Sequence, residues 1–344
     1  MQLRFHPHTL ELRHAFGVAS NTRTSTPAML VEIEQDGIIG YGEAAMPPYL
    51  GESQESAAAF LRRIEPGAYP DPAQLDAIIP AIDALAPGNP AAKAAVDIAL
   101  HDWFGKKQGT PLHRLWGLDP AKTPVTSFTI GIDTPEIVRQ KTIEAAPYRI
   151  LKVKLGRGAD GDRELIETIR EVTDKPITID ANQGWKDREE ALRMIEWLAG
   201  RGVVFIEQPM PKAQVDDTAW LRDRSPLPLI ADESVQRLAD VARAPGVFDG
   251  INIKLMKCTG LREARQMICR ARELGLKVML GCMTETSCAI SAAAQISPLV
   301  DWVDLDGAML IKNDCFDGAT MVDGKITPTN RPGIGVVKRP GSEI

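Results

Sequence analysis

The chain has 344 residues and a formal net charge of −6, with 44% hydrophobic residues. That length fills one large domain or two ordinary ones around a proper apolar core. The acidic balance argues against nucleic acid or an anionic membrane as a partner, because either would require a basic surface. No apolar run is long enough to cross a bilayer, and the N-terminal segment lacks the apolar stretch of a signal peptide. The five cysteines include no CxxC pair, so we expect reduced thiols and a cytoplasmic protein.

The first part of the chain, to about residue 118, predicts an α+β unit. Apolar and polar residues alternate on both sides of Asp36-Gly37, which is typical of a β-hairpin. Helical segments follow, among them the long stretch 89–109. We therefore assign residues 1–118 to one domain.

From about residue 122 the architecture becomes repetitive. Short apolar runs alternate with helical stretches at intervals near 25 residues, which is typical of a closed parallel (β/α)8-type barrel, here in a modified (β/α)7β form. We assign the barrel to residues 119–311 and expect the Gly- and Pro-rich tail, 312–344, to return to the first domain. The eight runs are PVTSFTIG, YRILKVKLG, PITIDAN, VVFIEQP, PLIADES, GINIKLM, KVMLGCM and VDLDGAM.

A glycine pattern in the second strand–helix connection admits another interpretation. Gly156, Gly158 and Gly161 form a G-x-G-x-x-G sequence after a strand and before a helix, which is the fingerprint of a dinucleotide-binding fold. The preceding strand carries internal lysines, however, and Asp160 and Asp162 in the loop would repel a pyrophosphate. We favour an ordinary connecting loop over an NAD-dependent oxidoreductase.

Three acids end consecutive predicted strands. Asp180, Glu207 and Asp232 are 27 and 25 residues apart, and each interval is one strand–helix unit. Neighbouring strands of a barrel bring such side chains into one volume, where uncompensated carboxylates would repel one another. A divalent cation removes that conflict, and ligation by oxygen alone favours Mg²⁺, with Mn²⁺ as the second choice. We expect Asn182 and Glu233 to support this site.

Lysines occur on the second and sixth strands, which stand opposite each other in an eight-stranded barrel. Lys152 and Lys154 share one face of the second strand, and Lys254 lies on the sixth. Lys257 is expected to be a rim residue that reaches solvent. A substrate held on the cation would then have an amine on each side.

This arrangement suggests proton transfer at a carbon next to a carboxylate. Removing that proton creates an enediolate, whose charge Mg²⁺ stabilises as a Lewis acid. A neutral lysine must take the proton, and Lys152 would lower the pKa of the neighbouring Lys154. A second lysine on the opposite face can return the proton there, which inverts the carbon. The pattern indicates a racemase or epimerase.

At this point the residues resemble a known family. The K-x-K on strand two, the acids on strands three to five and the lysine on strand six resemble the muconate-lactonizing subgroup of the enolase superfamily, over essentially the whole chain. The resemblance implies that the first domain is a cap over the barrel mouth. It also implies Lys154 and Lys254 as bases, and Asp180, Glu207 and Asp232 as metal ligands.

The eighth strand narrows the resemblance. Asp304 and Asp306 in DLDGAM form a D-x-D that resembles the signature of the dipeptide epimerases, where it would hold a substrate ammonium. The stretches GYGEAAMPPY and GCMTETS also resemble that family, although Glu285 departs from the apolar or thiol side chains expected there. The alternative for the aspartates is a turn-capping pair.

We expect a homo-oligomer that acts on a small-molecule dipeptide. The resemblance implies that the metal and Lys152 hold the α-carboxylate and that a loop of the capping domain contacts the substrate side chain. Here that loop is ASNTRTSTP, where Arg23 would pair with an acidic side chain. L-Ala-D/L-Glu is therefore the first-choice substrate, and hydrophobic or cationic dipeptides are the alternative. The nearest other reactions are those of a cycloisomerase, an o-succinylbenzoate synthase or an N-succinylamino acid racemase.

Overall fold

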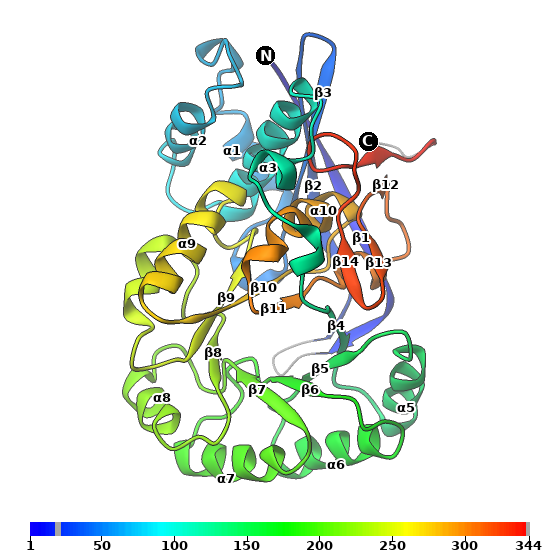
Figure 1. The fold of residues 1–344 in the computed structure, drawn as a ribbon, viewed down its shortest axis with the longest axis vertical. Helices are drawn as coiled ribbons and strands as arrows, with labels where there is room; N and C mark the ends of the chain where they lie inside the picture. The colour runs from blue at the N-terminus through cyan, green and yellow to red at the C-terminus, as the bar shows by residue number, and fades with distance from the viewer. Residues whose placement is uncertain (18–21, 342–344) are drawn as a thin grey trace.

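The structure is a computed structural model that describes residues 1–17 and 22–341. The first part of the chain folds into an antiparallel three-stranded sheet in the order β1-β2-β3, with helices packed against it (Figure 1). Asp36 and Gly37 form the turn between β2 and β3 with φ of 55° and 72°, which is the geometry that an Asp-Gly hairpin favours. The elements are β1 (Gln2–Gly17), β2 (Thr22–Gln35), β3 (Ile38–Ala45), α1 (Gln54–Leu61), α2 (Leu75–Asp83), α3 (Pro90–Lys107) and α4 (Leu112–Leu115).

Helix α3 lies directly on β3. A side chain at Gly42 would place its Cβ 1.9 Å from the carbonyl oxygen of Ala95, so only glycine permits this approach of helix to strand. Nearly every residue of α3 is buried, because the sheet covers one side and the barrel helix α9 contacts another.

The rest of the chain forms a parallel eight-stranded sheet that curls into a barrel, as the sequence predicted. Its order is β4 to β11 without exception, and the helices surround it (Figure 1). The strands are β4 (Ser127–Ile130), β5 (Ile150–Lys154), β6 (Ile177–Asp180), β7 (Val203–Glu207), β8 (Leu229–Ala231), β9 (Gly250–Lys254), β10 (Lys277–Gly281) and β11 (Trp302–Asp304). The helices are α5 (Pro135–Glu144), α6 (Ala159–Arg170), α7 (Arg188–Ala199), α8 (Val215–Arg222), α9 (Leu261–Glu273) and α10 (Ser287–Ile296), and a 3-10 helix, η4 (Leu238–Arg243), joins β8 to β9.

The barrel closes through a thin seam. The first and last strands, β4 and β11, meet through the bridge between Thr126 and Val303, and the Thr126 hydroxyl also accepts a hydrogen bond from the amide of Leu305. No helix follows β11 in the described part of the chain; a short 3-10 turn, η6 (Gly307–Met309), leads into the tail instead. This is the (β/α)7β form that the sequence analysis expected.

The tail returns to the first part of the chain. The amide of Lys312 donates to the carbonyl of Glu11 on β1, and Pro111 forms a parallel bridge with Gly333. Two short antiparallel pairings lie within the tail. The pairs are β12 (Phe316–Asp317) with β15 (Val337–Lys338), and β13 (Thr320–Val322) with β14 (Lys325–Thr327). We propose that residues 1–118 and 312–344 act as one capping unit, because these contacts join them.

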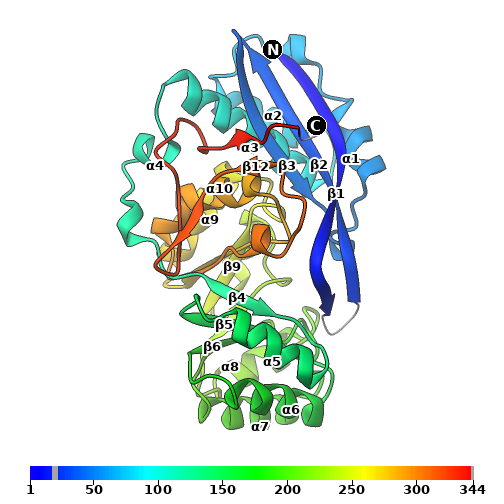
Figure 2. The same cartoon turned by 90° about the vertical axis from the view of Figure 1, so that its right-hand side faces the viewer.

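A continuous apolar core runs through both parts of the molecule. Figure 2 shows the cap sheet alongside the barrel, with the far ends of β1 and β2 beside β4. The amide of Ile132, just after β4, donates to the carbonyl of Gly17 at the end of β1. The hairpin of β1 and β2 therefore reaches one rim of the barrel. Among the described helices, none combines the length and apolarity needed to cross a membrane.

Candidate active site

Three buried carboxylates meet at the C-terminal ends of neighbouring barrel strands. Asp180 ends β6, Glu207 ends β7, and Asp232 directly follows β8. Asp180 and Glu207 are register partners in the parallel pairing of their strands. One oxygen from each of the three side chains lies within 4.8 Å of the others. The strand–helix spacing seen in the sequence therefore produces a real cluster.

The cluster fits a hard divalent cation. Every donor is a carboxylate oxygen, which is the ligand that Mg²⁺ and Mn²⁺ prefer. Burial, and next the charge of Asp180, raises the pKa of Glu207 to about 7, so the acids repel one another. Within the described residues, Glu207 Oε2 accepts no hydrogen bond, although the Lys152 ammonium lies 2.7 Å away as an ion pair. A cation among the three acids would satisfy both features.

Lysines on two barrel strands reach this cluster, two from β5 and one from β9. On β5, Lys152 Nζ lies 2.8 Å from Asp304 Oδ2, and Lys154 Nζ lies 2.6 Å from Asp180 Oδ2. On β9, Lys254 Nζ lies 2.7 Å from Asp232 Oδ2. Strands β5 and β9 are separated by β6, β7 and β8 on one side and by β10, β11 and β4 on the other. Lys154 and Lys254 therefore approach from opposite walls of the barrel.

The acids control the charge of these lysines. Burial alone would lower the pKa of Lys254, but the negative charge of Asp232 outweighs it and holds that pKa well above its usual value. Burial would likewise lower the pKa of Lys152, but the negative charges of Asp304 and its neighbours outweigh burial and raise that pKa. The two positive ammonium groups therefore offset part of the negative charge of the carboxylates.

The aspartates after β11 face the same cavity. Asp304 accepts hydrogen bonds from the Ser127 hydroxyl at 2.6 Å and from Lys152. Asp306 accepts from the backbone amide of Thr129 at 2.6 Å, and burial raises its pKa to about 7. Asp306 makes no capping hydrogen bond to the turn that follows it. The geometry therefore differs from the turn-capping alternative.

The two residues expected to support the site lie together beside it. Asn182 has φ of 44° and donates from its amide nitrogen to Glu233 Oε1 at 3.5 Å. Its backbone amide donates to Asp180 Oδ1, which leaves Asp180 Oδ2 for the lysines. One carboxylate oxygen of Asp180 thus holds the loop, and the other faces the cluster.

Arg23 lines the cavity from the cap. The sequence analysis placed Arg23 in a loop, but the structure places it on β2. Residues 19–21 of the expected loop fall outside the described residues. Arg23 Nε donates to the Thr26 hydroxyl at 3.1 Å, and Thr26 shares a 2.7 Å hydrogen bond with Thr284 on the barrel side. Burial lowers the pKa of the guanidinium. Arg23 of the cap is thus connected through Thr26 to Thr284 at the barrel rim.

Tyr49 and Met283 line the cavity and were given no role by the sequence analysis. Tyr49 follows β3 and donates from its hydroxyl to Met283 Sδ at 2.9 Å, which links the cap to the loop after β10. Their signal was present, because Tyr49 and Met283 lie in the stretches GYGEAAMPPY and GCMTETS. The sequence alone did not indicate which residues of those stretches face the cavity.

Glu285 does not line the cavity. Its Oε1 accepts a hydrogen bond from the amide of Met283 at 2.9 Å, and burial, followed by the nearby charge of Glu43, raises its pKa to about 8. Glu285 is therefore not placed to contact the side chain of a molecule bound in this cavity. Glu285 shapes the loop that presents Met283.

Lys257 is not a rim residue, so that expectation was wrong. It is fully buried, and its ammonium donates to Asp232 Oδ1 at 2.5 Å and to the backbone carbonyls of Asp232, Val235 and Asn252. The chain turns back over it just after β9, which no strand periodicity reveals. Lys257 holds one oxygen of Asp232 and leaves the other to face Lys254 and the cluster.

The glycine pattern is a connecting loop. Asp162 accepts hydrogen bonds from the backbone amides of Gly156 and Arg157, which are the groups that a pyrophosphate would need. The strand before it directs Lys152 and Lys154 into the barrel. The structure thus supports the sequence argument against a dinucleotide site here.

The cavity enclosed by these residues has a volume of about 410 Å³, which lies in the range of small-molecule sites. Cap and barrel both contribute to it, so a bound molecule would contact both. The residues lining it are Arg23, Tyr49, Thr129, Lys152, Lys154, Asn182, Gln183, Pro211, Asp232, Glu233, Lys254, Cys282, Met283, Thr284, Asp304, Asp306 and Leu310. Asp180 and Glu207 lie buried at its base.

Comparison with known proteins gives consistent matches. The chain is 60% identical over 339 residues to the L-Ala-D/L-Glu epimerase of Bacteroides thetaiotaomicron, covering 98% of this chain and 88% of that protein. The dipeptide epimerase of Enterococcus faecalis, solved with Mg and L-Leu-L-Tyr, has a TM-score of 0.90 and 30% identity, covering 97% of this chain and 98% of that one. The N-succinyl Arg/Lys racemase of Bacillus cereus has a TM-score of 0.91 and 29% identity, covering 98% and 95%.

Two family models cover most of the sequence. Residues 3–117 match the N-terminal domain of mandelate racemase / muconate lactonizing enzyme, and residues 136–340 match the enolase C-terminal domain-like family. The epimerases among the matched proteins are isomerases. The chain belongs to the mandelate racemase / muconate lactonizing enzyme family of the enolase superfamily.

Proposed function

We propose that this protein is a divalent-cation-dependent dipeptide epimerase, an isomerase that inverts the α-carbon of the C-terminal residue. One observation carries the proposal. Lys154 and Lys254 approach a single cavity from opposite walls, between a carboxylate cluster and a pair of buried aspartates. That geometry suits removal of a proton from one face of a carbon and its return to the other.

In this mechanism each lysine serves one face of the substrate. Lys154 takes the α-proton from one epimer while Lys254 delivers a proton to the opposite face, and the roles exchange in the reverse direction. Lys152 lies at the cluster and orients the α-carboxylate. Bound Mg²⁺ or Mn²⁺ supplies positive charge that offsets the three acids and stabilises negative charge on the carboxylate.

The aspartate pair suits the free amino group of a dipeptide. Asp304 is already held by Ser127 and Lys152, whereas Asp306 accepts a hydrogen bond from the backbone amide of Thr129. A substrate ammonium would pair with these buried acids. An N-succinylated amino acid has no ammonium and carries an extra carboxylate, which the aspartates would repel. This favours a dipeptide over an N-succinylamino acid substrate, and a cycloisomerase or o-succinylbenzoate synthase would not need the pair.

The metal assignment has its own test. Replacing Asp232 by Asn should weaken Mg²⁺ binding by about 10- to 100-fold, because one anionic ligand is lost. Isothermal titration of the metal measures this directly, and raised Mg²⁺ should recover part of the activity. Asp216→Asn, a change at an exposed acid on α8, is the control and should leave Mg²⁺ affinity unchanged. Equal affinity in the Asp232→Asn variant and the wild type would exclude Asp232 as a ligand.

We propose L-Ala-D/L-Glu as the preferred substrate. Arg23 is the cap cation that lines the cavity, and its guanidinium can form two parallel hydrogen bonds with a side-chain carboxylate. Hydrophobic or cationic dipeptides are the second choice, and of these Tyr49 and Met283 favour the hydrophobic ones. A library of L-Ala-L-Xaa dipeptides, followed by α-proton exchange in D₂O, decides between them.

A variant at Arg23 tests the same assignment. Arg23→Ala should lower kcat/KM for L-Ala-L-Glu by about 10- to 100-fold, the cost of losing a charge-assisted pair. L-Ala-L-Leu serves as the control substrate, because its side chain has no carboxylate, and its kcat/KM should change little. If both substrates lose activity equally, Arg23 has a structural role and the choice of glutamate fails.

We also propose a cytoplasmic, homo-oligomeric protein. The five cysteines form no disulfide among the described residues, and three of them are buried. Cys282 lines the cavity, where a reduced thiol packs beside Met283.

A further inference from the structure

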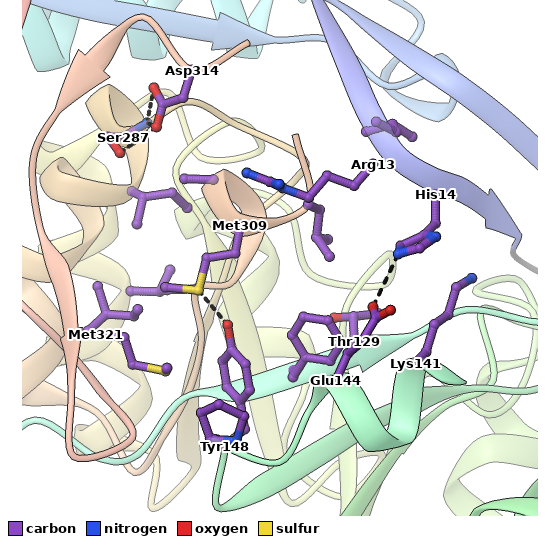
Figure 3. Close-up of a pocket in the computed structure, with 18 of the residues that line it drawn as sticks. Arg13, His14, Thr129, Lys141, Glu144, Tyr148, Ser287, Met309, Asp314 and Met321 are labelled. Carbon is purple, nitrogen blue, oxygen red and sulfur yellow. Dashed lines mark hydrogen bonds and ion pairs between the residues drawn. The ribbon is translucent and has the colours of Figure 1, made fainter. Parts of the chain in front are cut away.

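A second cavity, of about 570 Å³, lies behind the barrel seam. Its walls come from β1, β4, α5, α10, η6 and the tail hairpin of β13 and β14 (Figure 3). This is the outer side of the barrel next to β11, where the described chain continues as η6 and the tail rather than as a helix. The cavity thus follows from the (β/α)7β form of the barrel.

The interior of this cavity is apolar and adaptable. Its volume falls within the roughly 300–1,000 Å³ range of small-molecule sites. Methionine side chains on two sides can adjust to a ligand of irregular shape. The Tyr148 hydroxyl donates to Met309 Sδ, which links the segment after α5 to η6 across the cavity wall (Figure 3). The main apolar lining residues are Phe128, Tyr148, Ile290, Leu305, Met309 and Met321.

The charged groups at the edge of the cavity leave one cation available. Glu144 pairs with His14 at 3.2 Å, and Asp314 accepts from the Ser287 hydroxyl at 2.6 Å. Lys141 pairs with Asp133, and Arg339 pairs with Asp317. Arg13 is exposed, and its side chain makes no hydrogen bond or ion pair to any described residue; Figure 3 shows it extending over the cavity near Met309.

We propose that this cavity is a binding site for a small apolar anion. The anionic head, a carboxylate or sulfonate, pairs with Arg13, and the apolar body fills the space between Met309, Met321 and Phe128. Charge complementarity selects the head, because Arg13 is the lining cation whose charge is not already matched. Neither the proposed reaction nor the cluster of acids uses this cavity.

The back wall of the cavity is also the wall of the candidate active site. Along β4, Ser127 and Thr129 face inward to the aspartates, and Phe128 between them faces the cavity. After β11 the alternation repeats, with Leu305 in the cavity between the inward-facing Asp304 and Asp306. Thr129 and Leu310 line both cavities, so the two sites share part of one wall.

Occupancy of the cavity should therefore act on the aspartate pair. A ligand that pushes on Phe128 or Leu305 would displace the chain next to the hydrogen bonds from Ser127 to Asp304 and from Thr129 to Asp306, at the seam that an isolated bridge closes. The predicted consequence is a change in KM for the dipeptide. This consequence rests on the proposed function, whereas the binding itself does not.

Binding is tested with 8-anilinonaphthalene-1-sulfonate, an apolar anion whose fluorescence rises in apolar surroundings, on the whole protein with Mg²⁺. The wild type should show one saturable site. Met321→Glu places an anion in the cavity and should weaken binding by at least about tenfold. The matched control is Val322→Glu, because Val322 is the next residue of β13, is exposed and does not line the cavity. It should bind the probe as the wild type does.

A second variant removes the proposed head-group partner. Arg13→Ala should also weaken binding by about tenfold, whereas Arg193→Ala, at an exposed arginine on α7, should have no effect. Probe binding that is unaffected by both Met321→Glu and Arg13→Ala would overturn the proposed site.

The link between the two sites is read from kinetics. Saturating probe should change the KM for L-Ala-L-Glu by at least about threefold in the wild type, and should leave the KM of Met321→Glu unchanged at the same probe concentration. One-site binding without any change in KM would overturn the link and keep the site. If no dipeptide is epimerised at all, the proposed function fails, and the fluorescence titrations still decide the site.

Discussion

Replacing Lys254 by Ala should abolish epimerisation in both directions, with kcat reduced by at least about 10³-fold, and Lys154→Ala should do the same. General-base catalysis accounts for roughly 10²- to 10⁴-fold, and an inversion needs both bases in every turnover. Each variant retains the lysine of the opposite wall. We therefore expect each to exchange the α-proton of one epimer with solvent, and the two variants to act on opposite epimers.

The measurement is proton exchange in D₂O, followed by NMR for L-Ala-L-Glu and L-Ala-D-Glu separately. Lys254→Arg is the matched variant, since it keeps a positive charge beside Asp232 but cannot become a neutral base. It should be as inactive as Lys254→Ala. Near-normal turnover in any of these variants, or exchange of both epimers by a single-lysine variant, would contradict the opposed arrangement of bases.

Lys257→Met should destabilise the protein by about 3–5 kcal/mol, which is the typical cost of removing one partner from a buried ion pair. The substitution leaves Asp232 Oδ1 and three backbone carbonyls without their shared donor in the interior. Urea unfolding monitored by circular dichroism measures the loss.

The control is Lys277→Met, because Lys277 pairs with Asp301 only at 3.5 Å on an exposed surface. That change should cost less than about 1 kcal/mol. In the Asp232→Asn background, Lys257→Met should cost clearly less than in the wild type, since the carboxylate partner is gone. A loss below about 1 kcal/mol in the wild type would show that Lys257 does not hold Asp232.

The barrel and its acids could be predicted because their signals are periodic. A strand–helix unit has a nearly constant length, so the spacing of Asp180, Glu207 and Asp232 alone predicts that all three lie at the C-terminal ends of neighbouring strands. The alternation of side chains along a strand placed Lys152 and Lys154 on one face in the same way. Both predictions depend only on geometry that repeats within one strand or one strand–helix unit.

Features made by segments distant in sequence could not be predicted. Lys257 is buried because the chain folds back over it, and its four acceptors come from the strand ends and loops around it. Tyr49 meets Met283 only because the cap closes against the barrel. The cavity behind the seam exists because the tail, rather than a helix, follows β11, and its walls come from elements distant in sequence. No pattern within one segment encodes such contacts.

The central claim is that the protein inverts a dipeptide at its C-terminal residue through two opposed lysines. The most direct measurement incubates L-Ala-L-Glu with the wild-type protein and Mg²⁺ in D₂O, and follows the products by NMR and mass spectrometry. We predict that L-Ala-D-Glu forms and that each product molecule carries one deuterium at the α-carbon of its glutamate. Loss of water, ring closure, or product that retains its original α-proton would contradict the account.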